Sequence, residues 1–386
     1  MLGIAGQIIT VGAHAVGLAT HATPALQGED FTEFYLTQPV LMAQLSQGPV
    51  EFNGMINFEG LTLERGELNA GVWGEGYADR RHPHTYLHEA ALTLQGDVFR
   101  SRVSLTAGRG FAPFGSDDPM VRPFVKYPAN HHLAQLLERL ILIGALQHGP
   151  VTLEAGLFNG TEPVDPEDTG DFGAFGDSWS GRATLHPWHW LELQASYAEV
   201  TSPENQFGGG LDHEMWHASA RVERAIGDVN AYLLVETGET SEGVNGFQVF
   251  FFHTALAEAA LQRGRWQLAL RLERSERPEE ERETNLFRTV RPATDNSILG
   301  ITRWTSAGLQ LAAATRLGSF RLQPFVEVTR LHVQPLEEFP VLLPENLYGS
   351  DRMWSFSLGI RSVIGAWHTR MGRYGAARQA AQQHHH

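Results

Sequence analysis

The stretch "HWLELQASYAEV", residues 189–200, decides the fold because the side chains of residues 191–197 alternate between two kinds. In an extended chain, successive side chains point to opposite faces. The odd-numbered residues from Leu191 to Tyr197 are apolar, and the even-numbered residues from Glu192 to Ser196 are polar. This period of two predicts a β-strand with one apolar face and one hydrated face.

The same period returns along much of the chain, between short turn signals. It is clear in "EMWHASARVERA" (214–225), "RWQLALRLER" (265–274) and "RMWSFSLGIR" (352–361). Turn signals centred on glycine or proline lie at 46–49, 95–98, 147–150, 186–189, 225–228, 262–265, 316–319 and 363–366. Eight hairpins predict sixteen antiparallel strands.

Long polar connections separate these hairpins, so short and long links alternate. We expect the long connections at 60–83, 110–138, 159–179, 199–213, 237–246, 275–302 and 333–352. Membrane barrels sort their loops in this way, and their strands of about ten residues match a tilted bilayer span. Aromatic residues near strand ends fit an interfacial girdle: Tyr86, Trp190, Trp216, Trp266 and Trp354.

The predicted fold class is therefore all-β: a closed antiparallel transmembrane β-barrel of about 16 strands. Its short turns would be periplasmic and its long loops extracellular. Closure leaves no edge strand, and it satisfies the backbone inside lipid. A soluble or solenoid-like β protein shares the alternation and stays open as an alternative.

Composition excludes several classes of function. The formal charge of -15 argues against nucleic acid as a partner, because a phosphate-binding face needs clustered Lys and Arg. The absence of cysteine excludes disulfides, cysteine-ligated metals and thiol catalysis. The longest internal apolar run, "LILIGAL" (140–146), is too short for a spanning helix.

We expect three regions along the chain. Residues 1–34 are expected as an N-terminal arm or a signal remnant, because "LGIAGQIITVGAHAVGLATHA" (2–22) is uncharged apart from two histidines. Residues 35–375 form the transmembrane barrel. Residues 376–386 form a C-terminal tail whose final "HHH" is typical of a purification tag.

By hairpin count, loop asymmetry and girdle aromatics, residues 35–375 resemble the sixteen-stranded outer-membrane porins of Gram-negative bacteria, including the phosphate-selective type. The resemblance implies the bacterial outer membrane as the location, and the lipid bilayer and small solutes or ions as partners. Many porins are trimers, so it also admits a homo-oligomer. One departure is Tyr374, the expected terminal aromatic, which twelve further residues follow.

The resemblance to phosphate-selective porins implies a ladder of cations in the lumen, and the polar faces of the strands do not show one. The lumen-facing acids would be Glu51, Glu59, Glu89, Glu154, Glu192, Glu223, Glu236, Glu273 and Glu327. The lumen-facing cations would be Arg100, Arg102, Arg221, Arg271, Arg321 and Arg361. Such a mixed wall predicts a hydrated channel that is not anion-selective.

The second long loop, "GRGFAPFGSDDPMVRPFVKYPANHHLAQLLER" (108–139), carries apolar anchors and, after the N-cap Asn130, a short helix. We expect it to fold into the barrel and to narrow the pore. The constriction would place Arg109, Arg122 and Lys126 opposite Asp117 and Asp118. A cap outside the rim, or a contact with a neighbouring protomer, stays open.

The stretch "RRHPHTYLHE" (80–89) raises the question of a metal. A helix would make His84 and His88 a zinc pair. The strand that continues into "AALTLQGDV" favours period two, which puts both histidines outward beside Tyr86, at the rim, with Glu89 facing the lumen. A surface metal contact through His82 and His84 stays open.

Calcium is the other cofactor that the residues allow. The acidic loop 159–179 holds six carboxylates, which could bind Ca2+, although the spacing is not that of an EF-hand. We otherwise expect no cofactor.

Three functions fit the pattern, and enzymatic activity is not among them. Ser219 and His217 share a face, but it is the lumen face, the wrong side for a lipid substrate. The function expected first is a porin-like channel for passive diffusion of small hydrophilic solutes or ions. A metal-ion or ligand-specific uptake porin and a non-conducting structural barrel remain alternatives.

Overall fold

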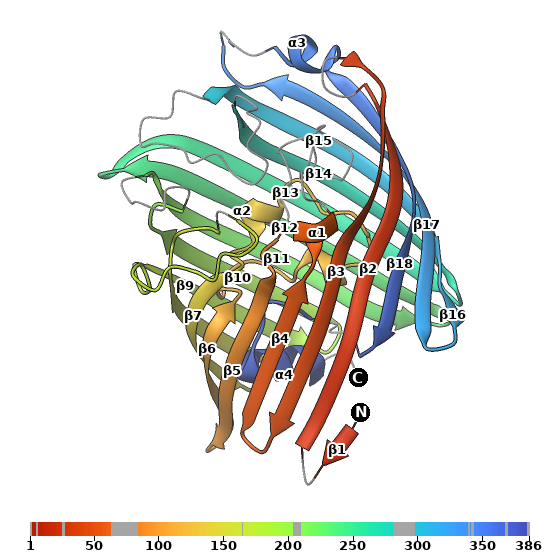
Figure 1. Ribbon diagram of the computed structural model, residues 1–386. Coiled ribbons are helices and arrows are strands. Elements are labelled where there is room, and N and C mark those ends of the chain that lie inside the picture. Colours follow the sequence, from red (N-terminus) through yellow and green to blue (C-terminus); the bar gives the residue numbers. More distant parts are fainter. Residues whose placement is uncertain are drawn as a thin grey trace.

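The structure is a computed structural model that describes residues 2–4, 7–24, 28–62, 84–163, 165–203, 210–280, 298–338, 340, 343–366 and 370–383. Among these residues, no helix is both long and apolar enough to cross a bilayer. Most of the described chain lies in long tilted strands that form one barrel (Figure 1).

The barrel is a closed ring of sixteen antiparallel strands. The sheet holds eighteen strands, of which β1 (Leu2–Ile4) and β16 (Thr315–Leu317) are three-residue pieces beside the ring. The ring strands are β2 (Gln7–Thr23), β3 (Phe31–Gln47), β4 (Val50–Asn57), β5 (Leu87–Val98), β6 (Ser101–Gly110), β7 (Arg139–His148), β8 (Val151–Phe158), β9 (Ser178–Trp188), β10 (Leu191–Val200), β11 (Asp212–Ile226), β12 (Val229–Val244), β13 (Phe247–Arg263), β14 (Trp266–Glu280), β15 (Ile298–Ala313), β17 (Phe320–Pro335) and β18 (Arg352–Gly365). The pairing of β18 with β2 closes the ring, so the predicted fold class is confirmed.

Seven of the eight predicted turns join neighbouring strands at or near the predicted positions. The β5–β6 turn lies slightly later than predicted, at Phe99 and Arg100, and the β9–β10 turn centres on His189 and Trp190. The eighth prediction, at 363–366, is wrong, because β18 ends at Gly365 and no paired strand follows among the described residues up to 383. The chain enters the barrel interior instead (Figure 1).

The missing last strand is replaced by one from the other end of the chain. Residues 7–23, expected as an N-terminal arm or signal remnant, form β2, which pairs with β18 and β3. The inner face of β2 carries Val16 and Leu18, which pack against Val125 and Tyr127 of the inward loop. Because part of the inner face of β2 packs on apolar side chains of the loop, its sequence lacks the regular polar alternation of a lumen wall.

One predicted long loop is a tight turn. The connection expected at 237–246 consists of Asn245 and Gly246, because β12 and β13 continue to meet there. Both residues have positive φ, 53° and 80°, as the two central residues of a type I′ hairpin require. Of the loops expected at 60–83 and 275–302, residues 63–83 and 281–297 lie outside the described residues.

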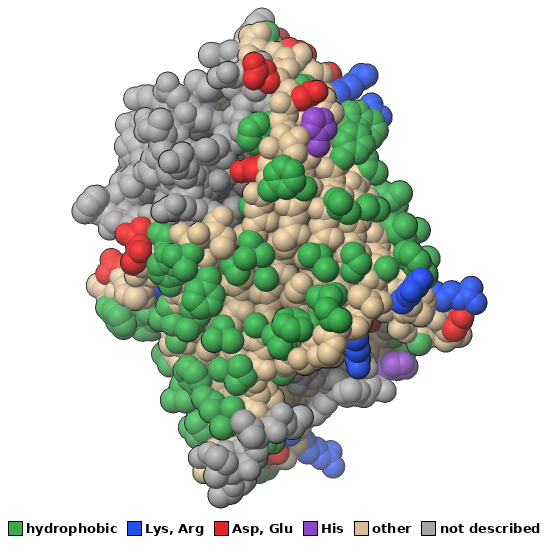
Figure 2. Space-filling view, turned by 45° about the vertical axis from the view of Figure 1, so that its right-hand side comes forward, with side chains coloured by type: hydrophobic (Ala, Val, Ile, Leu, Met, Phe, Trp, Pro, Cys, Tyr) green, Lys and Arg blue, Asp and Glu red, His purple; other side chains and the backbone are tan. Residues whose placement is uncertain are grey.

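The outer face of the barrel is apolar. Large side chains such as Leu94 (56% exposed) and Leu358 (63% exposed) point away from the lumen. Figure 2 shows hydrophobic side chains spread over this face, with most charged side chains towards its two ends. The pattern is that of a wall facing lipid.

The expected girdle residues lie near the two rims. Trp266 begins β14 at the short-turn rim and is 49% exposed, whereas Trp216 and Trp354 lie towards the long-loop rim. Trp190 stacks on Trp188 beside the β9–β10 turn. Tyr86 is half-buried just before β5.

Four short helices complete the chain: α1 (Glu59–Thr62), α2 (His131–Ala134), α3 (Pro344–Tyr348) and α4 (Gly375–Gln383). Residues 376–386, expected as a C-terminal tail, include most of α4, which lies in the lumen against β5 to β8. Its buried face consists of Ala376, Ala377, Ala380 and Ala381. Tyr374, expected at the end of the last strand, also lies inside the barrel, and residues 384–386 lie outside the described residues.

Candidate functional site

The loop between β6 and β7 folds into the barrel. Nearly all of residues 111–138 are buried, and apolar anchors such as Phe111 and Met120 pack with wall residues Met42 and Met55. Burial of these side chains removes from water an apolar surface that a solvent-exposed loop would leave uncovered. The expected inward fold of this loop is therefore observed.

Wall carboxylates and amides hold the backbone of the loop. The N–H of Phe124 donates to Glu258 at 3.2 Å, that of Val125 to Gln310 at 2.9 Å, and that of Asn130 to Glu273 at 2.7 Å. A buried N–H without an acceptor is costly, so polar wall side chains do here what water would do in an open lumen.

Each cation of the expected constriction has a partner in the barrel wall, and Arg122 also donates to the backbone carbonyl oxygen of Asp117 at 3.1 Å. Arg122 donates to Glu236 of β12 at 3.2 Å, and Lys126 lies 3.4 Å from Glu327 of β17. Arg109, near the end of β6, donates to the carbonyl oxygen of Leu87 at 2.7 Å. The role of these residues at a constriction stays a prediction.

The two loop acids have separate partners. Asp118 accepts the N–H of Met120 at 2.7 Å, at the start of a short 3-10 turn. Asp117 contacts Arg221 of β11 and the C-terminal residues Arg370 and Arg373. Burial alone would raise the pKa of the Asp117 carboxyl, but these three guanidinium groups hold it below its ordinary value.

The C-terminal segment supplies cations that the strand pattern did not reveal. Arg370 and Arg373 donate to Glu192 of β10 at 2.8 Å each, and Arg378 donates to Glu51 of β4 at 3.0 Å. Three arginines within nine residues of "RMGRYGAAR" (370–378) were the signal available. Their acidic partners lie far away in sequence, so the sequence could not identify them.

The C-terminal segment also meets the inward loop. The hydroxyl of Tyr374 accepts the N–H of Phe111 at 3.0 Å, and Arg182 of β9 donates to the carbonyl oxygen of Gly372 at 2.7 Å. The loop and the segment therefore pack together, and the segment lies against the β4–β10 side of the lumen.

Most of the expected wall residues do face inward. Buried among the wall and its contents are Glu51, Glu89, Glu154, Glu192, Glu236, Arg271, Glu273 and Glu327, with Glu59 in α1. Partly buried on the inner side are Arg102, Arg221, Glu223 and Arg361, which contact the inward loop, α4 or one another. Arg100 and Arg321 are exposed at the short-turn rim, outside the wall proper. The pattern missed Arg182 and Glu258, buried partners of Glu154 and Arg271.

A polar cavity of about 620 Å³ lies on the opposite side of the lumen. It lies between Pro123 of the inward loop and the short-turn ends of β11 to β14. Its lining includes Glu223, Arg224, Asn230 and Gln267. The lumen thus has a filled side and a hollow side.

The histidine assignment made from period two is wrong, and a β-bulge is the reason. Opposite β5, Met55 pairs with Glu89 and Ile56 pairs with Leu87, so His88 is an extra residue without a partner. A bulge of this kind shifts the alternation by one residue. Leu87 consequently faces outward at 37% exposure, while His88 is 1% exposed.

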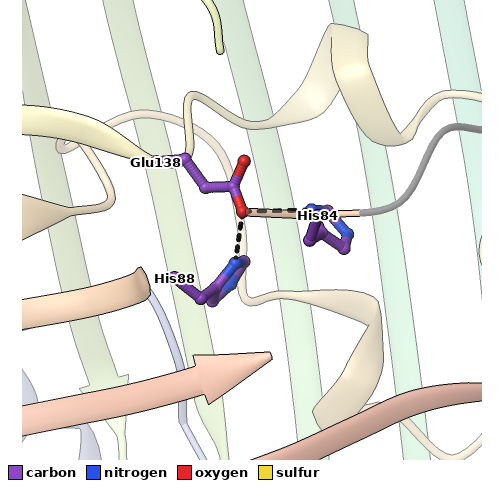
Figure 3. A group of neighbouring side chains, drawn as sticks. All are labelled: His84, His88 and Glu138. Carbon is purple, nitrogen blue, oxygen red and sulfur yellow. Dashed lines mark hydrogen bonds and ion pairs between the residues drawn. The ribbon is translucent and has the colours of Figure 1, made fainter. Parts of the chain in front are cut away.

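The bulge brings three potential metal ligands together inside the barrel. Oε1 of Glu138 lies 2.7 Å from Nδ1 of His88 and 3.5 Å from Nδ1 of His84 (Figure 3). Glu138 has φ of 60° just before β7 begins. Burial alone would raise its pKa, but hydrogen bonds and charge from the two histidines hold it well below the ordinary value. His82 lies outside the described residues.

Most carboxylates of the acidic loop 159–179 have separate hydrogen-bond or ion-pair partners. Glu162 pairs with Arg139 at 3.0 Å, and Asp165, Asp168 and Asp171 each accept a backbone N–H two residues ahead. Calcium binding by this loop stays a prediction.

Ser219 and His217 face the lumen and bind a third residue. Each lies within hydrogen-bond distance of Oε1 of Gln194, at 3.0 Å and 3.1 Å. His217 is also 3.5 Å from Glu236. The two side chains therefore belong to the polar network that surrounds the inward loop.

No family model and no curated protein matches the chain. Among solved structures, the anion-selective porin from Comamonas acidovorans has a TM-score of 0.55 at 10% identity, covering 93% of this chain and all of that one. This is an outer-membrane porin fold. In-vitro folded OmpT, an outer membrane protein of Vibrio cholerae, matches with a TM-score of 0.51 at 9% identity, over 94% of this chain and 99% of that chain. The expected resemblance to the porin fold is confirmed.

Proposed function

We propose that the protein is an outer-membrane channel through which small hydrophilic solutes or ions diffuse passively. The observation that carries this proposal is a closed ring with an apolar outer face and a charged inner wall that encloses a polar cavity. A closed ring of sixteen strands is wide enough to enclose an aqueous path. The backbone hydrogen bonds between its strands remain satisfied inside lipid.

The solute path runs along the hollow side of the lumen. The C-terminal segment occupies the β4–β10 side, and the inward loop crosses the lumen as far as Glu258 of β13, where it borders the cavity beside β11 to β14. Pro123 of the loop borders the cavity, so the loop sets its width. Glu223 and Arg224 both line it, and such a mixed lining favours a weakly selective channel.

Two neighbouring alanines in β13 provide a matched test of this path. Ala260 lines the cavity and is 5% exposed, whereas Ala259 lies on the opposite face of the same strand. In planar bilayers, Ala260→Trp should lower the single-channel conductance to about half or less, because an indole then occupies the path. Ala259→Trp should leave it unchanged.

Equal conductance in the two variants would place the path elsewhere. A folded protein that never conducts would favour the alternative of a structural barrel. Deletion of residues 116–129 gives an independent measure, because removing this stretch of the inward loop should enlarge the channel.

We also propose a homo-oligomer without enzymatic activity. A trimer form of Vibrio cholerae OmpT, with a TM-score of 0.50 at 10% identity, supports the first part. The lumen-side binding of Ser219 and His217 to Gln194 supports the second. The mass of the detergent-solubilised protein, after subtraction of bound detergent, tests the oligomer.

A further inference from the structure

His84, His88 and Glu138 are the one group of three or more potential ligands in the described chain whose donor atoms lie within 4.8 Å of one another. All three side chains are at least 96% buried. Figure 3 shows both imidazoles turned towards the carboxylate. We propose that this group binds one divalent transition-metal ion, of which zinc is the representative.

The donor set and its spacing fit such an ion. Zinc lies about 2.0–2.2 Å from nitrogen and oxygen donors, which puts neighbouring donors of a tetrahedron about 3.3 Å apart. The distances from Oε1 of Glu138 to Nδ1 of His88 and His84 are 2.7 and 3.5 Å, within tenths of an ångström of that value, and all three ligand atoms lie within 4.8 Å of one another. Two imidazoles and one carboxylate suit zinc and its neighbours better than calcium or magnesium, which prefer oxygen alone.

The surroundings favour a cation and orient the ligands. Nε2 of His88 is buried without a hydrogen-bond partner among the described residues, and buried Nδ1 of His84 has the carboxylate of Glu138 at 3.5 Å. The N–H of Thr85 donates to Oε1 of Glu138 at 2.9 Å, and that of His84 lies 3.4 Å from Oε2 of Glu59. Outer contacts of this kind hold metal ligands in place.

The charges around the group are mainly negative. Asp118 and Glu89 act electrostatically on His88 in addition to Glu138, and Arg109 is the cation that acts on Glu138 from β6. Arg378 lies 4.0 Å from Glu89, so an entering divalent cation is met by three acids, Glu138, Asp118 and Glu89, against two arginines.

The ligands come from two elements that a bound ion would join. His88 forms the bulge of β5 and His84 precedes that strand, while Glu138 is the last residue of the inward loop. Three protein donors leave a fourth position for water or another ligand. The ring of His131, whose centroid lies 6.0 Å from that of His84, is the neighbouring imidazole. A bound ion would fix the end of the loop to the barrel wall.

The test uses the full folded chain in detergent without its terminal residues 384–386, because those three histidines would themselves bind metal. After treatment with a chelator, zinc is titrated and bound metal is measured by elemental analysis. We expect one zinc per chain, and a visible absorption band of tetrahedral cobalt when cobalt replaces zinc. His88→Ala and Glu138→Gln should each weaken binding about a hundredfold or more, beyond what loss of an outer contact causes.

His148→Ala is the control, because this histidine lies at the exposed end of β7 and binds Ser101. It should bind zinc as the parent does. If the parent binds no zinc, or if His88→Ala and Glu138→Gln bind as tightly as it does, the group is an ion pair only and the proposal is wrong. Circular dichroism selects the variants that fold, and His84→Ala replaces one that does not. Conductance does not enter this test, so its result is separate from that of the channel.

Discussion

Arg122 and Glu236 show at the scale of single residues how the interior is held together. Their side chains are 2% and 0% exposed and lie 3.2 Å apart, and Ser116 and Asn130 also donate hydrogen bonds to the carboxylate of Glu236. Buried charges need such partners, because a charge left alone in the interior loses its hydration without compensation. The pair fastens the middle of the inward loop to β12.

Replacement of Arg122 by alanine should therefore be costly. We expect Arg122→Ala to lower the free energy of unfolding by about 3–5 kcal/mol, because Glu236 would keep its charge without its main partner. Arg263→Ala is the matched control, since Arg263 pairs with Asp228 at 2.7 Å on the surface with 75% of its side chain exposed. That variant should lose less than about 1 kcal/mol. Urea unfolding in lipid vesicles compares the two, and similar losses would contradict the account.

Asp117 predicts how stability depends on pH. Its pKa in the folded protein is held below the ordinary value, which is about 3.9 in an unfolded chain, so the unfolded state binds the proton more readily. This contribution is fully present above about pH 4 and is lost as pH falls through the lower, folded pKa.

The measurement compares unfolding free energies of the parent and Asp117→Asn between about pH 6 and 2. The parent should lose more stability than the variant on acidification. Asp228→Asn, at the exposed pair with Arg263, should follow the parent curve. Parallel curves for the parent and Asp117→Asn would show that the three arginines do not depress the pKa of Asp117.

His88 marks the limit of residue-level prediction. Period two correctly places Glu89, Ala91 and Thr93 inside and Leu92 and Leu94 outside. It fails one residue earlier, because the bulge opposite Met55 and Ile56 adds a residue to β5. The sequence "TYLHEA" (85–90) does not predict a bulge, because a bulge depends on the register of the neighbouring strand.

At the scale of elements, the strands that can be predicted from the sequence are those with one polar face and one apolar face. β10 and β14 alternate cleanly, since their inner faces carry Glu192 and Arg271. β2 escapes prediction because its inner face packs on the inward loop through Val16 and Leu18. The count of sixteen was nevertheless correct, because the overlooked strand β2 offsets the strand wrongly expected after residue 366.

A disulfide tests whether β2 closes the ring. Thr20 of β2 lies opposite Ser357 of β18, and their hydroxyl oxygens are 2.7 Å apart. The chain has no cysteine, so Thr20→Cys with Ser357→Cys introduces the only thiols. Cross-strand neighbours are close enough for a disulfide, and we expect oxidation of the folded protein to link the two ends of the chain.

The linked chain should migrate differently from the reduced chain on a denaturing gel, and a reductant should abolish the difference. The control pairs Thr20→Cys with Ser362→Cys, because Ser362 lies opposite Ala15 and not Thr20. A cross-link in the control alone, or in neither variant, would mean that residues 7–23 do not pair with β18 in this register.

At the scale of the whole molecule, the lumen of the barrel holds two segments, the inward loop from the middle of the chain and the C-terminal segment. The alternation of apolar and polar side chains predicts the barrel wall, because it recurs in most of the strands. The positions of the two segments inside the lumen depend on contacts such as Arg378 with Glu51 and Tyr374 with Phe111, which join residues far apart in sequence. These contacts cannot be predicted from the composition of the chain or the spacing of its residues.

The conductance of single molecules in a planar bilayer, before and after removal of residues 367–386, tests the central claim most directly. The intact protein should conduct in discrete steps along the hollow side, and the shortened protein should conduct in larger steps. Arg370→Ala with Arg373→Ala and Arg378→Ala, which leaves the chain length unchanged, should shift conductance in the same direction. A folded intact protein that passes no current, or shortened and triple variants with unchanged steps, would contradict a partly filled channel.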